Sequence, residues 1–245
     1  MQRVVWMMVA LGMAVAAAVS FTATPVHADG EASVTGSVTL GHAAADAWTF
    51  SDTNGWVSCP DYSHTPSFTD LTFTATIQEG CSFNVTSSWG GAFGDEPNLW
   101  GSFSIDGALP EVGGAYEWPV PLVTLTVSVV DSDGTPVEVA GLRSSNWWSS
   151  TEFPGPADLP FNVSTWTANL DAPAAASEYE LPVVPTEATP VQAVLTNGLT
   201  IHQWVDTTAG DTSVTLVTPD PAALDGTLDF GAGATGWAWE SRSAA

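Results

Sequence analysis

The stretch "TDLTFTATIQEGCSFNVTSSW", residues 69–89, alternates apolar and polar side chains over two consecutive runs. The apolar positions recur at every second residue: Leu71, Phe73, Ala75 and Ile77, then Cys81, Phe83, Val85 and Trp89. Because successive side chains of a strand point to opposite faces, each run predicts a β-strand with one buried face. The short link at residues 78–80 predicts that the two strands pair as a hairpin.

The same alternation recurs along the rest of the chain. "LVTLTVSVV" (122–130) is followed by "DSDG", which resembles the start of a calcium loop but lacks the further oxygen ligands and the distal glutamate. A tight turn is therefore the better interpretation. In "PVQAVLTNGLTIHQWVD" (190–206), Asn197-Gly198 separates two alternating runs and is a strong hairpin signal.

Regular short strands with almost no helical periodicity predict an all-β fold. We expect an antiparallel β-sandwich, with jelly-roll or immunoglobulin-like Greek-key connections. Turn-forming residues at 106–114 suggest a division into an N-terminal β region, residues 29–112, and a C-terminal β region, residues 113–245. One large sandwich and two small modules both fit this pattern.

Residues 1–28 have the pattern of a secretory signal peptide. Arg3 precedes an apolar run over residues 4–21, and Val26 and Ala28 stand three and one positions before a cut after Ala28. The alternative is an uncleaved membrane anchor, since about 18 apolar residues can span a bilayer. The cleavage pattern favours removal, which predicts a secreted or extracytoplasmic protein with no membrane contact afterwards.

The chain carries almost no positive charge. It has 27 acidic residues and three arginines, and it has no lysine. Removal of Arg3 with the signal peptide leaves two arginines and a net charge of −25. Nucleic acids and anionic membranes are bound through Lys and Arg, so the composition argues against both as partners. It also excludes lysine-dependent chemistry such as Schiff bases and P-loops.

The two cysteines, Cys59 and Cys81, are 22 positions apart. In an exported protein an even pair predicts a disulfide. No histidine or further cysteine lies at ligand spacing, so neither a metal site nor a cofactor is expected. No G-x-S-x-G motif is present, and pairs of acids suited to glycoside hydrolysis arise by chance among so many carboxylates. We therefore expect a protein that is not an enzyme.

Tryptophan is the informative residue type. Strand context predicts a buried position for three of the twelve: Trp48, Trp89 and Trp166. In "SSNWWSS" (144–150), Trp147 and Trp148 would point to opposite faces of a strand. That stretch is either a loop or rim, or a strand end with one ring buried and the other lying on the surface.

Two further stretches present tryptophan beside polar residues. In "GWAWES", Trp237 and Trp239 would share one face of a strand, about 7 Å apart. In "TIHQWVD", Trp204 shares a face with His202 and Asp206, opposite an apolar face, which predicts that Trp204 is exposed. Exposed aromatic rings on a secreted sheet suit stacking on sugar rings or contact with another protein.

These observations favour a secreted, acidic, non-enzymatic protein that acts at the cell surface or envelope through interaction with other proteins. The alternative is a carbohydrate-binding module that uses the exposed tryptophans and binds surface polysaccharide. A secreted hydrolase is the third and weakest interpretation. The candidate aromatic surface for either kind of binding comprises five residues: Trp147, Trp148, Trp204, Trp237 and Trp239.

Overall fold

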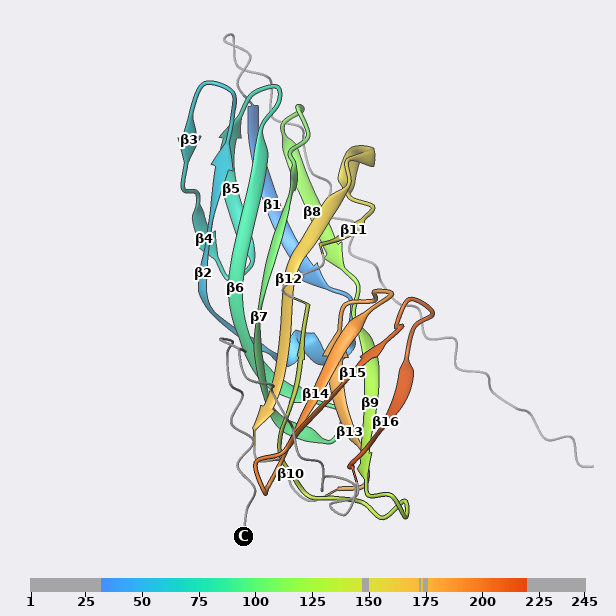
Figure 1. Ribbon diagram of the computed structural model, residues 1–245. Coiled ribbons are helices and arrows are strands. Elements are labelled where there is room, and N and C mark those ends of the chain that lie inside the picture. Colours follow the sequence, from blue (N-terminus) through green and yellow to red (C-terminus); the bar gives the residue numbers. More distant parts are fainter. Residues whose placement is uncertain (1–31, 147–149, 172, 174–175, 220–245) are drawn as a thin grey trace, which may run out of the picture.

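Strands account for most of the chain that the computed structural model describes, which is residues 32–146, 150–171, 173 and 176–219 (Figure 1). Sixteen strands form three sheets. Within the described residues, helical structure is limited to two short 3-10 turns, η1 (Ala43–Ala47) and η2 (Pro156–Asp158). The predicted all-β fold is confirmed.

A nine-stranded antiparallel sheet forms one layer of the molecule. Its strands are, in spatial order, β15 (Thr200–Val205), β14 (Thr189–Leu195), β10 (Val139–Ser145), β12 (Phe161–Asp171), β7 (Glu96–Ala108), β6 (Ser82–Phe93), β2 (Thr49–Ser58) and β3 (Ser63–His64), with β11 (Thr151–Phe153) also paired to β12. The three longest strands, β6, β7 and β12, lie side by side at its centre (Figure 1).

Two smaller sheets form the opposite layer. One contains β4 (Ser67–Thr69), β5 (Thr72–Ile77), β1 (Ala32–Leu40) and β8 (Gly114–Val120), and the other contains β13 (Tyr179–Val183), β9 (Val123–Val130) and β16 (Thr212–Val217). The chain passes from the first to the second between β8 and β9 (Figure 1). Most strand pairs are antiparallel, as predicted, but β1 with β8 and β9 with β16 are parallel.

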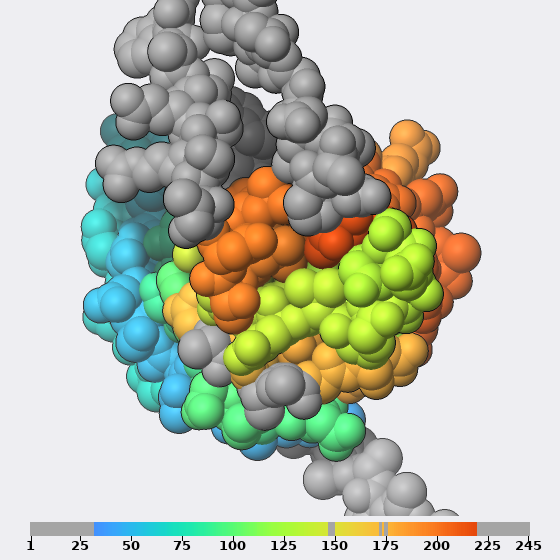
Figure 2. Space-filling view, turned by 60° about the horizontal axis from the view of Figure 1, so that its bottom comes forward, coloured from blue at the N-terminus to red at the C-terminus, as the bar shows by residue number. Residues whose placement is uncertain are grey.

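The two smaller sheets cover the same face of the large one. At one end, Phe83 of the large sheet lies with its ring centroid 4.5 Å from that of Trp118 on β8. At the other end, the indole N–H of Trp166 on β12 donates to the carbonyl of Pro182 on β13, at 2.9 Å. Seen from below, the yellow-green β9–β10 segment lies beside the orange segment that contains β14 (Figure 2).

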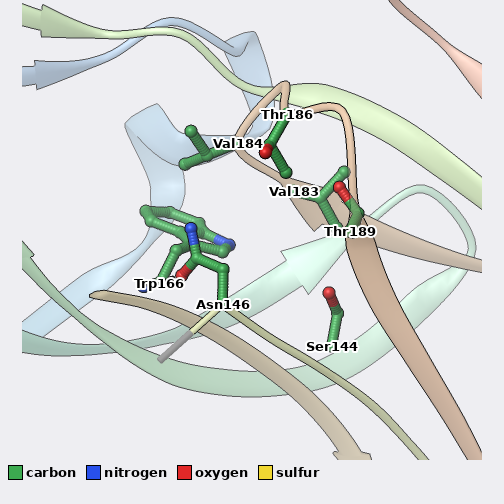
Figure 3. Close-up of a pocket in the computed structure, with 7 residues that line it drawn as sticks. All are labelled: Ser144, Asn146, Trp166, Val183, Val184, Thr186 and Thr189. Carbon is green, nitrogen blue, oxygen red and sulfur yellow. Dashed lines mark hydrogen bonds between the residues drawn. The ribbon is translucent and has the colours of Figure 1, made fainter. Parts of the chain in front are cut away.

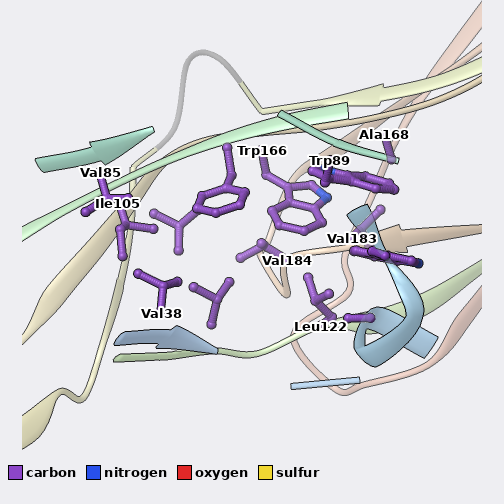
Figure 4. Packing of buried hydrophobic residues seen from close by; sticks show 14 of the residues in the cluster. Val38, Val85, Trp89, Ile105, Leu122, Trp166, Ala168, Val183 and Val184 are labelled. Atoms are coloured by element: carbon purple, nitrogen blue, oxygen red, sulfur yellow. The ribbon is translucent and has the colours of Figure 1, made fainter. Parts of the chain in front are cut away.

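A column of stacked aromatic rings fills the centre of the core (Figure 4). Trp48 stacks on Trp89 at a centroid distance of 4.2 Å, and Trp89 stacks on Trp166 at 5.6 Å. Phe103 closes the column against Trp166 at 6.0 Å. The three tryptophans predicted to be buried are therefore confirmed as core residues. Gly101 lies under the Trp89 ring, where an added Cβ would come within 2.7 Å of it.

The predicted hairpin between the strands at 71–77 and 81–89 is wrong. β5 pairs with β1 and β4, whereas β6 pairs with β2 and β7, so the link at 78–80 crosses from one layer to the other. Phe73 and Phe83 face each other across the core, with ring centroids 5.9 Å apart. Alternation identifies the buried face of each strand but not its neighbour. Two strands can bury their apolar faces either side by side in one sheet or opposite each other in two packed sheets.

The predicted disulfide between Cys59 and Cys81 is confirmed. Cys59 follows β2 and Cys81 precedes β6, and the neighbouring residues Ser58 and Ser82 are directly paired. The bond therefore fixes the ends of two adjacent strands, beside the link that crosses between the layers.

Two predicted turns are also confirmed. Asn197-Gly198 joins β14 to β15, with Gly198 at φ 84° and its N–H donating to the Leu195 carbonyl at 2.9 Å. The "DSDG" stretch is a tight turn, in which the Asp131 carboxylate accepts from the backbone N–H groups of Asp133 and Thr135. The Asp131 carboxylate therefore stabilises the turn by accepting hydrogen bonds from its backbone.

Loss of the disulfide should destabilise the protein. A crosslink that closes a loop of 22 positions stabilises by about 3 kcal/mol in the chain-entropy model. We expect a Cys59→Ala, Cys81→Ala double variant to lose free energy of unfolding of that order, measured by denaturant titration. Reduction of the wild type should give the same loss, and no loss in either case would contradict a stabilising role.

Glu96 should make stability depend on pH. It is a buried residue at the start of β7. Burial raises the pKa of its carboxyl above 4.5, and the charges of Asp95 and Glu180 raise this pKa further. The free energy of unfolding therefore falls as the pH rises from 4.5 to the folded-state pKa of Glu96, and the loss is complete above that pKa. We expect Glu96→Gln to raise the melting temperature at pH 7, with a gain that fades below pH 4.5.

A matched control for this variant is Glu111→Gln, which removes the same charge from an exposed position. It should leave the melting temperature nearly unchanged at both pH values. Equal effects of the two substitutions would show that net charge, rather than the burial of Glu96, controls the response.

Candidate functional site

The outer face of the nine-stranded sheet points away from the core and carries the exposed tryptophans of the described residues. Trp56 on β2 is 46% exposed, Trp100 on β7 is 50% exposed and Trp204 on β15 is 57% exposed. The other tryptophans of the described residues are buried: Trp48, Trp89, Trp118 and Trp166. Exposure of Trp204 agrees with its place in the alternation of its strand.

Strand register brings residues from five strands into a row across this face. The row runs through directly opposed pairs from β15 to β7: His202, Gln192, Arg143, Asn169 and Trp100. A second row lies two residues along the strands and contains Trp204, Pro190, Ser145, Thr167 and Ser102. These ten residues come from positions 100 to 204, so only the sheet brings them together.

The two rows line a groove of about 560 Å³, which we call the outer groove. This volume lies within the range of small-molecule sites in proteins. Trp100 and Trp204 lie on strands at opposite sides of the groove. Four strand spacings separate them, which corresponds to about 19 Å measured across the sheet. Most of the residues between the two rings have polar side chains, with hydroxyl and amide groups and one guanidinium, but Pro190 and Val191 also line the groove, and its exposed lining as a whole is more apolar than polar.

Hydrogen bonds hold the Trp100 side of the outer groove in place. The indole N–H of Trp100 donates to the Asp171 carboxylate at 2.9 Å, and the Asn169 amide donates to the Trp100 carbonyl at 3.3 Å. The backbone N–H of Ser102 donates to the Thr167 hydroxyl at 2.8 Å. Trp100 is thus an exposed ring whose orientation is set before any ligand arrives.

Arg143 lies near the middle of the row, on β10, and is exposed. Arg3 and Arg242 fall outside the described residues, so Arg143 is the one Lys or Arg within them. No carboxylate of the described residues forms an ion pair with it. Its directly opposed neighbours, Asn169 and Gln192, are neutral.

A closely packed region underlies the end of β10, just before the "NWWS" stretch (Figure 3). The backbone N–H of Asn146 donates to the Trp166 carbonyl at 3.0 Å, and the backbone N–H of Trp166 donates to the Asn146 side chain. The space around them, lined also by Ser144, Val183 and Thr189, has no room for a water molecule. Asn146 is therefore a structural anchor rather than part of a ligand site.

The structure includes one of the five predicted binding residues, Trp204, in the outer groove. Trp147, Trp148, Trp237 and Trp239 lie outside the described residues. The last described residues before the Trp147-Trp148 pair include Ser145, which lines the groove.

Sequence reasoning missed Trp100 and Trp56. Both could have been found by alternation, because Leu99 and Gly101 flank Trp100 on the buried face, while Gly55 and Val57 flank Trp56 in the same way. A tryptophan out of phase with its apolar neighbours is predicted to face outward.

The described residues contain no cluster of three or more His, Cys, Asp or Glu side chains placed to hold a metal ion. Nor does this part of the chain contain a helix that is long and apolar enough to cross a membrane.

The sequence matches no protein-family model and no curated protein. Among solved structures it is similar to a putative cell adhesion protein from Bacteroides ovatus, with 11% identity over 74% of this chain and 91% of that one, at a TM-score of 0.26. It is also similar to the Streptococcal ancillary pilin, with 7% identity over 76% of this chain and 68% of that one, at a TM-score of 0.23. These values carry no argument about function.

Truncation of the adjacent residues Asn146 and Ser145 to alanine should have different effects on the free energy of unfolding. Asn146→Ala removes the acceptor of a buried backbone N–H, which should cost about 1–3 kcal/mol of unfolding free energy. The Ser145 hydroxyl is buried without a hydrogen-bond partner, so Ser145→Ala should be neutral or stabilising. Chemical denaturation of both variants checks this, and a comparable loss in each would contradict the assigned anchor role.

Proposed function

We propose that this is a secreted, non-catalytic binding protein that acts at the cell surface and binds polysaccharide through the outer groove. The observation that carries the proposal is the placement of the exposed tryptophans of the described residues on one face of one sheet. Two of them, Trp100 and Trp204, flank a groove that also contains hydroxyl, amide and guanidinium side chains.

The chemistry of the outer groove suits sugar rings. A pyranose presents C–H bonds on its faces, which pack against the electron-rich face of an indole ring, and hydroxyls at its edge, which need hydrogen-bond partners. Trp100 and Trp204 supply the indole faces. Between them, Gln192 and Asn169 supply amide groups.

Export is part of the same proposal. The disulfide supports it, because such bonds persist in oxidising compartments. The pattern of a signal peptide over residues 1–28 supports it from the sequence. The large negative charge agrees with a protein that works among neutral polymers and stays soluble there.

Contact with another protein is the second candidate function, and one observation favours it. Among the described residues, β15 pairs only with β14, so the other edge of this six-residue strand presents unpaired backbone groups. An open edge can accept a strand from another chain. Trp204 lies on this strand, so a partner protein at the edge would lie beside the outer groove.

Truncation of either groove tryptophan should weaken binding of polysaccharide. We expect Trp100→Ala and Trp204→Ala each to lower the affinity at least about tenfold, or about 1.4 kcal/mol, because each removes an aromatic anchor. Affinity electrophoresis against a panel of soluble neutral polysaccharides, with the purified secreted protein, measures this. Intrinsic fluorescence of the wild type should shift to shorter wavelength as ligand covers the rings.

The matched control is Val112→Ala, which trims a side chain that is 61% exposed and lies outside the sheet strands. It should bind like the wild type, and circular dichroism should show all three variants folded. If the wild type binds no polysaccharide, or if the folded tryptophan variants bind equally well, the proposal is wrong and the β15 edge becomes the site to test.

A further inference from the structure

The single arginine of the described chain occupies an unusual place. A protein with 27 acidic residues offers many partners for a guanidinium, yet Arg143 has none among the described residues. It lies instead between the two exposed rings of the outer groove, with neutral Asn169 and Gln192 directly opposite on the neighbouring strands. Among the described residues, nothing engages this cation, which leaves it available to a ligand in the groove.

The groups beside Arg143 can donate to the same ligand. Its guanidinium presents planar pairs of N–H donors that match an oxyanion in a bidentate arrangement. Gln192, directly opposite Arg143 on β14, lines the same groove, and its side-chain amide can donate to the ligand.

The charge of the whole protein limits which anionic ligands can bind. A densely charged polymer is repelled at long range by a chain with a net charge of −24. At physiological ionic strength this repulsion is screened over about 8 Å, whereas direct contact at Arg143 persists. An anionic group that is isolated among neutral sugars therefore gains the contact without the accumulated repulsion.

We propose that the outer groove selects polysaccharides that carry an isolated oxyanion substituent between neutral sugar rings, and that Arg143 is the residue that recognises this substituent. The rings stack on Trp100 and Trp204, and the carboxylate, phosphate or sulfate group lies between them on the guanidinium. This inference rests on the proposed function and adds the class of polysaccharide to it.

The test uses one soluble neutral glucan and derivatives of it that carry carboxylate, phosphate or sulfate groups at the same low degree of substitution. Isothermal titration compares the wild type, Arg143→Gln and Arg143→Lys. We expect the wild type to bind at least one sparsely substituted derivative about tenfold more tightly than the neutral parent, the scale of one charged hydrogen-bonded contact. The derivative that is preferred identifies the oxyanion.

Arg143→Gln should bind the neutral and substituted glucans with equal affinity, because it lacks the charge that prefers the oxyanion. Arg143→Lys should retain part of the preference, because it keeps the charge but loses the planar fork. At low salt, the wild type should bind a densely substituted derivative more weakly than the sparse one. Added salt should raise the affinity for the dense derivative, because it screens the repulsion between the two negative charges.

The outcomes separate this inference from the proposed function. If the wild type binds neutral and substituted glucans equally, or if Arg143→Gln keeps the preference, the role of Arg143 is refuted while polysaccharide binding stands. If Arg143→Gln loses affinity equally for both polymers, Arg143 contacts the neutral sugar and selectivity for an oxyanion is refuted. If the wild type binds none of the polymers, both proposals fail.

Discussion

Stacking of Trp48, Trp89 and Trp166 in the core is the interaction on which the rest of the structure depends. These rings come from three separate parts of the chain, and they meet on the face where the smaller sheets cover the large one. Because strand residues alternate between faces, fixing Trp89 and Trp166 inward also fixes which residues point outward. The outer groove is thus a consequence of the core: Trp100 is exposed because Gly101, the next residue, lies beneath the Trp89 ring.

The outer groove is formed by strands of the large sheet and not by loops. All ten residues of the two groove rows lie on strands that are paired in the large sheet, and hydrogen bonds from Asp171 and Thr167 hold the Trp100 side. A ligand therefore meets side chains that are already ordered, and little conformational entropy is lost on binding.

Sequence alternation predicted the strands, the buried tryptophans, the exposure of Trp204 and the turn at Asn197, because all of these follow from local periodicity. The disulfide followed from the compartment and the count of cysteines. The pairing of β5 with β6 was predicted wrongly, since periodicity says which face is buried but not which strand lies beside it. The outer groove could not be predicted for the same reason: Arg143, Asn169 and Trp100 are neighbours only through sheet register.

The twist of a β-sheet has a consequence for the shape of the ligand. Neighbouring strands rotate by roughly 20–25° relative to each other, so the four steps between β7 and β15 accumulate a rotation of roughly 80–100°. A twist of this average size would turn the strand of Trp204 well away from the direction of the strand of Trp100, four positions along the sheet. A flat crystalline array of polymer chains would then touch only one of these strands at a time, whereas a single chain with a helical turn of its own can follow both. Under the proposed function, such a twist would favour binding of a single polymer chain over binding of a packed fibre.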